Sequence, residues 1–125
     1  MNKETEIDKI VIKGVTYVPE TALPQALNLD GLEYCIVRTY TAGVFAGYLK
    51  ERNGKEGTIL QARRLWYWSG ASSLSEACLH GFANPSSCKF PEEVPSVILT
   101  EIIEILPCTE KARKSIKEIK VWSQK

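Results

Sequence analysis

The densest group of chemically capable side chains lies at residues 63–70, which read Arg-Arg-Leu-Trp-Tyr-Trp-Ser-Gly. Because side chains alternate between the two faces of a strand, a strand through this segment puts Arg64, Trp66 and Trp68 on one side. Aromatic rings and guanidinium groups stack on planar ligands, and arginine binds phosphate through paired hydrogen bonds. The segment is therefore the predicted binding surface.

The same side chains also have a structural interpretation, which stays open. Arg64 can pack over Trp66 or Trp68 as a cation–π pair, which contributes about 0.5–2 kcal/mol to stability without any ligand. Arg38 and Tyr40 share one face of the strand predicted at 34–40, and they are expected beside this cluster. The complete set of candidate ligand-binding residues is Arg38, Tyr40, Arg63, Arg64, Trp66 and Trp68.

No catalytic constellation accompanies this surface. Cys78 and His80 lie two residues apart on a predicted helix, so their side chains point away from each other. Glu101 and Glu104 fall on opposite faces of a predicted strand and cannot form the paired carboxylates of a glycosidase. The glycines at 43–57 lack the phosphate-loop motif and suit hairpin turns and a bulge. We therefore predict a non-enzymatic protein without a cofactor.

The cysteine spacing argues against a metal site. The four cysteines are separated by 43, 10 and 20 residues, and His80 is the single histidine of the chain. Zinc sites use closely spaced Cys and His pairs, which are missing here. Cys35 lies in an apolar strand pattern and Cys78 on a helix, where free cysteine packs as a small hydrophobic residue. We predict free thiols and no metal.

Composition is that of an ordinary soluble domain. The chain has 125 residues, of which 44% are hydrophobic and 25% charged, so one core can form without disulfides. No run approaches the ~20 apolar residues of a membrane span. The first residues are too polar for a secretion signal, so a cytoplasmic location is expected.

Charge is unevenly distributed along the chain. The formal net charge is +1, with three Lys against six acidic residues in 1–33 and seven basic against three acidic residues in 34–90. This bias is far short of the basic stripe of a protein that binds duplex nucleic acid. It suits a small anionic ligand at least as well.

The chain divides into an N-terminal arm and linker, 1–33, and one compact β-rich domain, 34–125. Apolar alternation around a Gly turn predicts a β-hairpin within residues 7–18, and prolines mark 20–30 as a linker with one helical turn. A lone hairpin is marginal in water, so it is expected to dock on another copy of the chain in a homo-oligomer.

Short β-branched and aromatic runs separated by tight turns predict an antiparallel meander. The Asn53-Gly54 pair is the strongest hairpin signal. The strands are expected at 34–40, 44–50, 56–62 continuing through 63–68, 94–106 as one long strand buried on most of both faces, and 119–122. The predicted core comprises Ile36, Val37, Phe45, Leu49, Leu60, Leu65, Ile98, Ile102 and Ile105.

Capping signals predict two short helices. Ser73, Glu76 and Gly81 have the spacing of an N-cap, its capping-box partner and a C-cap, and the second helix runs from Thr109 to Ile116. In the first helix the residues expected to face the sheet are Leu74 and Leu79. The loop at 82–93 is long enough for a lid or the rim of a pocket. The fold class is α+β, mainly antiparallel, as a β-meander or a small open barrel.

Several stretches keep a distinctive order and spacing: residues 34–47, the turn at 53–56, residues 62–68, Leu99-Thr100-Glu101, and Thr109-Glu110-Lys111-Ala112. Together they resemble a widespread family of small uncharacterised bacteriophage and prophage proteins. The resemblance covers about residues 34–116 and implies a viral origin with an early or accessory role. It carries over no functional residue, and the hairpin before Tyr34 looks like an extension found in some relatives.

Two functions from different classes follow. In the first, a phage counter-defence protein in the host cytoplasm sequesters a nucleotide-derived immune signal of the cyclic-nucleotide or ADP-ribose type. In the second, a phage accessory protein grips a host or virion protein through the same patch, since Trp, Tyr and Arg dominate interface hot spots. Single-stranded nucleic-acid binding is a third alternative.

Overall fold

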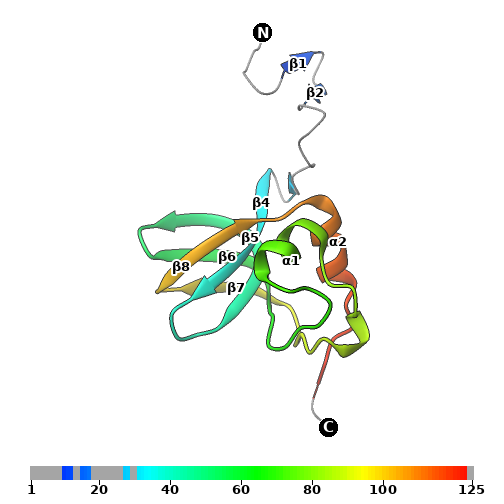
Figure 1. The fold of residues 1–125 in the computed structure, drawn as a ribbon. Coiled ribbons are helices and arrows are strands. Elements are labelled where there is room, and N and C mark those ends of the chain that lie inside the picture. Colours follow the sequence, from blue (N-terminus) through cyan, green and yellow to red (C-terminus); the bar gives the residue numbers. More distant parts are fainter. Residues whose placement is uncertain (1–9, 13–14, 18–26, 29–30, 124–125) are drawn as a thin grey trace.

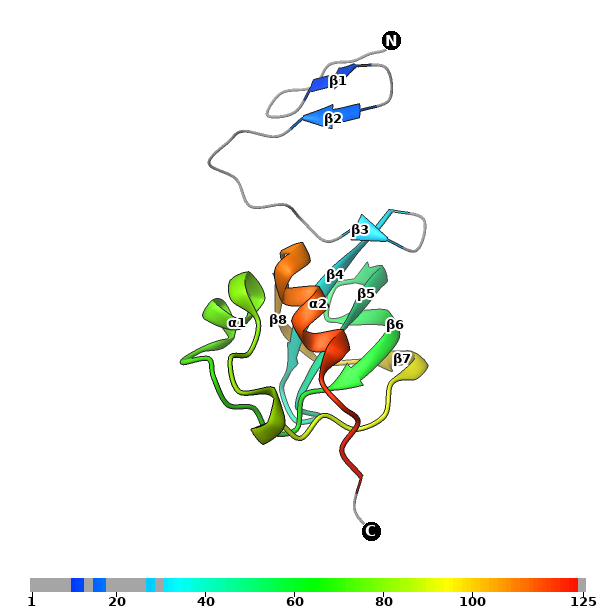
Figure 2. The same cartoon turned by 90° about the vertical axis from the view of Figure 1, so that its right-hand side faces the viewer.

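An antiparallel sheet covered on one face by two helices makes up the domain (Figures 1 and 2). The structure is a computed structural model, and it describes residues 10–12, 15–17, 27–28 and 31–123. The sheet contains β3 (Leu27–Asn28), β4 (Leu32–Thr39), β5 (Val44–Asn53), β6 (Glu56–Arg64), β7 (Val94–Leu99) and β8 (Ile102–Pro107). The helices are α1 (Leu74–His80) and α2 (Glu110–Glu118), with a 3₁₀ turn at Pro85–Ser87. The predicted α+β class is confirmed.

The predicted N-terminal hairpin is also present. Strands β1 (Ile10–Ile12) and β2 (Val15–Tyr17) pair antiparallel. In the predicted linker at 20–30, residues 27–28 form β3, which pairs with the start of β4. The remainder of that linker, including the expected helical turn, lies outside the described residues.

The sheet curls but does not close. Its central order is β4, β5, β6, β7, and β8 pairs with the opposite side of β4. Within the described chain, the edge strands β7 and β8 pair with β6 and β4 and not with each other. The sheet is therefore open, and the consecutive pairing of β4, β5, β6 and β7 is a β-meander.

A corner at Thr100 and Glu101 joins the two edge strands, so the prediction of one continuous strand over 94–106 is wrong. The amide of Tyr40 donates to the Glu101 carbonyl at 2.9 Å, and the amide of Ile102 donates to the Lys55 carbonyl at 2.8 Å. These bonds tie the corner to the end of β4 and to the β5–β6 turn. The chain changes edges here because the curled sheet brings both edges to the same place.

Two core layers follow from this arrangement. One lies between the sheet and the helices and includes Tyr34, Ile36, Tyr48, Leu65 and Phe90. The other fills the inside of the curl and consists of Cys35, Val37, Phe45, Ile59, Ala62, Leu99 and Ile102.

The predicted core is largely correct. Ile36, Val37, Phe45, Leu65 and Ile102 are buried, and three further members are half-buried: Leu49, Leu60 and Ile105. The prediction for Ile98 is wrong, because this side chain is 63% exposed. Its neighbours in sequence are also apolar, so periodicity could not show which of them turns inward on the edge strand.

Both helices begin at the predicted caps. The Ser73 hydroxyl accepts from the amide of Glu76 at 3.1 Å, and the Thr109 hydroxyl accepts from the amide of Ala112 at 3.1 Å. Gly81 ends α1 with φ +81°. The expected inward position of Leu79 is wrong, since it is 41% exposed. The buried residues of α1 are Ala77 and Cys78, because these small side chains let α1 approach the rest of the core.

The loop at 82–93 is anchored in the core, which does not suit the lid interpretation, and Phe82, Ala83 and Glu93 line cavities, as the alternative of a pocket rim predicts. Phe82, Cys88 and Phe90 are all buried in the layer under the helices. The ring of Phe82 packs edge-on against Phe90, with centroids 5.3 Å apart. Burying these rings fixes the loop on the domain.

Candidate functional site

The two adjacent arginines have opposite environments because β6 alternates its faces. Arg63 turns into the layer under the helices and is 4% exposed. It donates from Nε to the carbonyl of Pro91 at 3.1 Å, from Nη1 to Ile116 at 2.7 Å and from Nη2 to Phe90 at 3.2 Å. Burial lowers the pKa of its guanidinium group. Arg63, a predicted ligand-binding residue, therefore uses its donors inside the protein.

Arg64 turns to the other face. Its guanidinium carbon lies 4.4 Å from the centroid of the Phe45 ring, and Nη1 donates to the carbonyl of Ala42. This contact fastens the turn between β4 and β5. The cation–π pair predicted for Arg64 exists, but its partner is Phe45 instead of a tryptophan.

Arg38 and Tyr40 do not join Arg64 in a common site. Val37, Phe45 and Arg64 are register neighbours across three strands, so Arg38 falls on the opposite face of the sheet from Arg64. Its Nε pairs with Glu104 Oε1 at 2.8 Å, and both side chains are almost half exposed. Tyr40 follows the end of β4 and is 74% exposed.

The predicted strand over 63–68 ends at Arg64, so the expectation that Arg64, Trp66 and Trp68 share one strand face is wrong. Beyond Leu65 the chain leaves β5, and Tyr67 instead exchanges backbone hydrogen bonds with Lys89. Trp68 is half-buried and packs against Phe82, with ring centroids 6.3 Å apart.

An exposed cluster, the aromatic patch, gathers around Trp66. Trp66 is 57% and Tyr67 53% exposed. The Trp66 indole stacks on Trp122, with centroids 5.0 Å apart and planes 23° from parallel. The ammonium of Lys89 lies 5.5–5.7 Å from the centroids of all three rings. Val121, beside Trp122, is also exposed. The patch thus offers indole surface and a cation together.

Sequence reasoning found Trp66 but missed Lys89 and Trp122. The amide of Lys89 donates to the Tyr67 carbonyl at 2.7 Å, and the amide of Trp122 donates to the Phe90 carbonyl at 3.0 Å. These bonds bring two distant segments beside Trp66. The expected strand at 119–122 is only an isolated bridge between Val121 and Phe90. The sequence held one hint to this neighbour of Trp66, because Trp122 is the one tryptophan of the chain outside residues 63–70.

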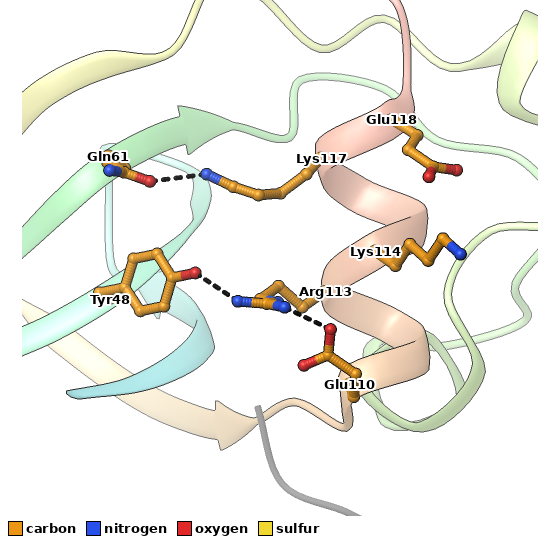
Figure 3. Close-up of a pocket in the computed structure, with 7 residues that line it drawn as sticks. All are labelled: Tyr48, Gln61, Glu110, Arg113, Lys114, Lys117 and Glu118. Atoms are coloured by element: carbon orange, nitrogen blue, oxygen red, sulfur yellow. Dashed lines mark hydrogen bonds and ion pairs between the residues drawn. The ribbon is translucent and has the colours of Figure 1, made fainter. Parts of the chain in front are cut away.

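A second candidate is a cavity between α2 and the sheet, called the α2 pocket below (Figure 3). Its volume is about 550 Å³. Its walls come from β5, β6 and α2 and consist of Tyr48, Gln61, Glu110, Arg113, Lys114, Lys117 and Glu118. None of these residues was a predicted site residue, although basic residues at 113 and 117 have helical spacing.

Hydrogen bonds order the α2 pocket. Arg113 Nη1 donates to the Tyr48 hydroxyl at 2.8 Å, and Nη2 pairs with Glu110. Burial lowers the pKa of Arg113, but its hydrogen bonds with Glu110 and Tyr48 outweigh burial and raise the pKa above its ordinary value. Lys117 Nζ donates to Gln61 Oε1 at 2.7 Å and pairs with Glu93 at 3.3 Å. Arg113 and Lys117 are thus charged donors oriented toward the sheet (Figure 3).

Gln61 has an uncommon backbone conformation. It alone among the described non-glycine residues has a positive φ, +50°, a region that costs L-residues roughly 1–2 kcal/mol. The register shift between β5 and β6 places Gln61 and Ala62 opposite Gly47, as in a β-bulge. Glycine is the usual residue at such a position, so the side chain of Gln61 stands there at a backbone cost.

The cysteines are free and buried, as predicted for small interior residues. Burial raises the pKa of the Cys35 thiol to about 12. In the described part of the chain, no group of three or more His, Cys, Asp or Glu residues is placed to hold a metal ion. Neither described helix has the length and apolar character needed to span a bilayer.

The fold and its two surfaces define a small α+β domain built on an open, curled antiparallel sheet. A family model described as a domain of unknown function, DUF6948, matches residues 32–116. The protein belongs to this family. No curated protein and no solved structure matches the chain.

Proposed function

We propose that the protein is a non-enzymatic binding protein that contacts a protein partner through the aromatic patch. The observation that carries this proposal is the exposure of Trp66 and Tyr67 beside the stacked Trp122. Leaving such rings in water forfeits about 25 cal/mol for each Å² of apolar surface. Contiguous exposed aromatic groups therefore favour a surface that becomes covered in a complex.

The shape of the patch favours a protein over a small molecule. Small-molecule sites are concave and enclose most of their ligand. Five cavities of the domain, one of which is the α2 pocket, are lined by residues other than Trp66 and Trp122. Trp and Tyr are the residues that dominate hot spots of protein interfaces. Lys89 adds a preference for a partner that presents a carboxylate next to an apolar side chain. We also propose a phage origin for the protein. The partner is then a host or virion protein that it binds in the host cytoplasm.

Affinity purification from infected or expressing host cells tests this proposal. Trp66→Ala is expected to weaken the complex by about 2 kcal/mol, or roughly thirtyfold, because it removes a central aromatic contact. Tyr40→Ala is the matched control, since Tyr40 is more exposed than Trp66 and lies outside the patch. The proposal requires a protein that copurifies with wild type and Tyr40→Ala but not with Trp66→Ala. Equal recovery with all three would contradict it.

Sequestration of a nucleotide-derived immune signal is the second candidate, and one observation favours it. The ammonium of Lys89 beside Trp66 and Trp122 can meet a phosphate while a base stacks on the outer indole. Calorimetry with cyclic dinucleotides and cyclic ADP-ribose isomers tests it directly. Binding that Trp66→Ala abolishes would favour this candidate over the protein partner, and no heat from any ligand would remove it.

A further inference from the structure

The α2 pocket has no part in the function proposed above, and its chemistry differs from that of the aromatic patch. We propose that the α2 pocket binds a small molecule that carries a phosphate group, with the oxyanion held by Arg113 and Lys117. The proposal stands independently of the aromatic patch.

Donors from two structural elements converge on the pocket. Arg113 and Lys117 are four residues apart on α2 and therefore project from the same helix face. Their targets on the sheet, the Tyr48 hydroxyl oxygen and Gln61 Oε1, accept at 2.8 and 2.7 Å. Because these oxygens act as acceptors, the hydroxyl proton of Tyr48 and the amide NH₂ of Gln61 are the groups left to donate. Charged and neutral donors around one cavity are the chemistry that recognises an oxyanion.

Gln61 gives a second, independent reason. Its positive φ is unfavourable for any residue with a side chain, and its side chain lines the α2 pocket. Strained backbone conformations persist where the surrounding structure holds them in place, and they cluster at active sites and ligand-binding sites. A glycine would suit the bulge better but would remove a donor from the pocket wall.

Glu110 serves as an internal substitute for the ligand. Its carboxylate pairs with Arg113 Nη2, and its side chain is 47% exposed, so it can rotate into solvent. A phosphate group presents three oxygens and more negative charge than a carboxylate. Lys114 also borders the cavity, but its side chain points away from the sheet, on the same side of α2 as Glu118 (Figure 3). Competition with Glu110 limits the affinity of the wild-type pocket.

The size of the cavity indicates an organic phosphate. A volume of about 550 Å³ exceeds that of a phosphate ion and falls within the range of small-molecule sites. A neighbouring cavity of about 510 Å³ shares Gln61 and Lys117 and extends to Val94 and Pro95. The organic part of the ligand can lie there, against these apolar side chains.

Calorimetric titration of the full-length protein with inorganic phosphate, ribose 5-phosphate and ribose tests the proposal. We expect ribose 5-phosphate to bind, inorganic phosphate to bind more weakly and ribose to give no heat. Glu110→Gln should tighten ribose 5-phosphate binding about tenfold, equivalent to about 1.4 kcal/mol, because it removes the competing charge. Arg113→Gln should weaken it by about the same factor. Lys111→Gln is the control of equal charge change, since Lys111 is exposed on α2 and does not line the pocket.

Gln61→Gly keeps the test decisive if Arg113→Gln does not fold. It relieves the positive φ, so we expect an unchanged or higher melting temperature together with weaker binding. Binding with equal affinity in Gln61→Gly and wild type would overturn the proposal. So would the absence of heat even with Glu110→Gln, or an equal loss with Lys111→Gln, which would indicate unspecific attraction to the basic helix. Tyr40→Ala, which lies outside both surfaces, should leave ribose 5-phosphate binding unchanged. The two proposals are tested separately, because Trp66→Ala reports on protein capture and Gln61→Gly reports on ribose 5-phosphate binding.

Discussion

Arg63 and Arg64 differ so strongly in environment that substituting them one at a time separates a buried anchor from a surface contact. In Arg63→Ala, the backbone carbonyls of Pro91, Phe90 and Ile116 each lose one donor, and backbone amides continue to donate to the last two. Hydrogen bonds from charged groups contribute about 1.5–3 kcal/mol each. Removing the guanidinium also removes the desolvation cost of a buried charge, and this offsets part of the lost stability. We expect a net destabilisation of roughly 3–5 kcal/mol, a large share of the total stability of a domain.

Arg64→Ala removes one hydrogen bond to Ala42 and a cation–π contact with Phe45 at an exposed position. The expected cost is about 1 kcal/mol. At roughly 4 °C per kcal/mol for a chain of this size, the melting temperature should fall by about 12–20 °C for Arg63→Ala and about 4 °C for Arg64→Ala.

Urea and thermal denaturation followed by circular dichroism measure both effects. Arg63→Met separates packing from hydrogen bonding, because it keeps an apolar stem and removes the donors. It should recover part of the loss but remain less stable than Arg64→Ala. Similar melting temperatures for Arg63→Ala and Arg64→Ala would refute the anchoring role that we derive for Arg63.

Two further outcomes follow from buried thiols and from the N-terminal arm. The folded state keeps Cys35 protonated up to a pKa of about 12, whereas unfolded thiols ionise near pH 9. The resulting stability is fully present below about pH 9 and is lost as the pH rises towards 12, with a slope of up to about 1.4 kcal/mol per pH unit; Cys35→Ala should flatten this slope in alkaline urea melts. The hairpin of β1 and β2 is expected to dock on another copy, so deletion of residues 1–30 should lower the number of copies per particle, obtained from the light-scattering mass divided by the mass of one chain. An unchanged number of copies would argue against that interface.

Local signals in the sequence predicted local structure well. The caps Ser73 and Thr109 and the Asn53-Gly54 turn were placed correctly, because each depends on hydrogen bonds or φ values within a few residues. Hydrophobic periodicity likewise identified the strands on both sides of the Asn53-Gly54 turn. Strand pairing in order along the chain then gave the antiparallel class.

The errors lie where distant segments decide the path of the chain. Apolar alternation continues through residues 94–106, and only the bonds from Tyr40 and to Lys55 reveal a corner at Glu101. Similarly, the chain leaves β5 after Leu65 because Tyr67 pairs with Lys89 instead. Neither event leaves a local signature, since the residue types at both places suit a continuing strand.

The candidate site was predicted only in part for the same reason. Trp66 and Tyr67 were recognisable from their density, but Lys89 and Trp122 enter the aromatic patch through two isolated backbone bridges. The α2 pocket depends on a register shift beside Gln61, which no composition or spacing rule locates.

Arg63 connects the two candidate surfaces although it belongs to neither. The Phe90 carbonyl accepts from Arg63 Nη2 at 3.2 Å and from the amide of Trp122 at 3.0 Å, so the guanidinium supports the backbone that positions Trp122. Its Nη1 also binds the Ile116 carbonyl near the end of α2, one residue before Lys117. A positive charge at a helix C-terminus is favourable, and here it fixes the helix that carries the α2 pocket. An arginine that seemed a ligand contact in the sequence thus acts from the interior by holding both surfaces in place.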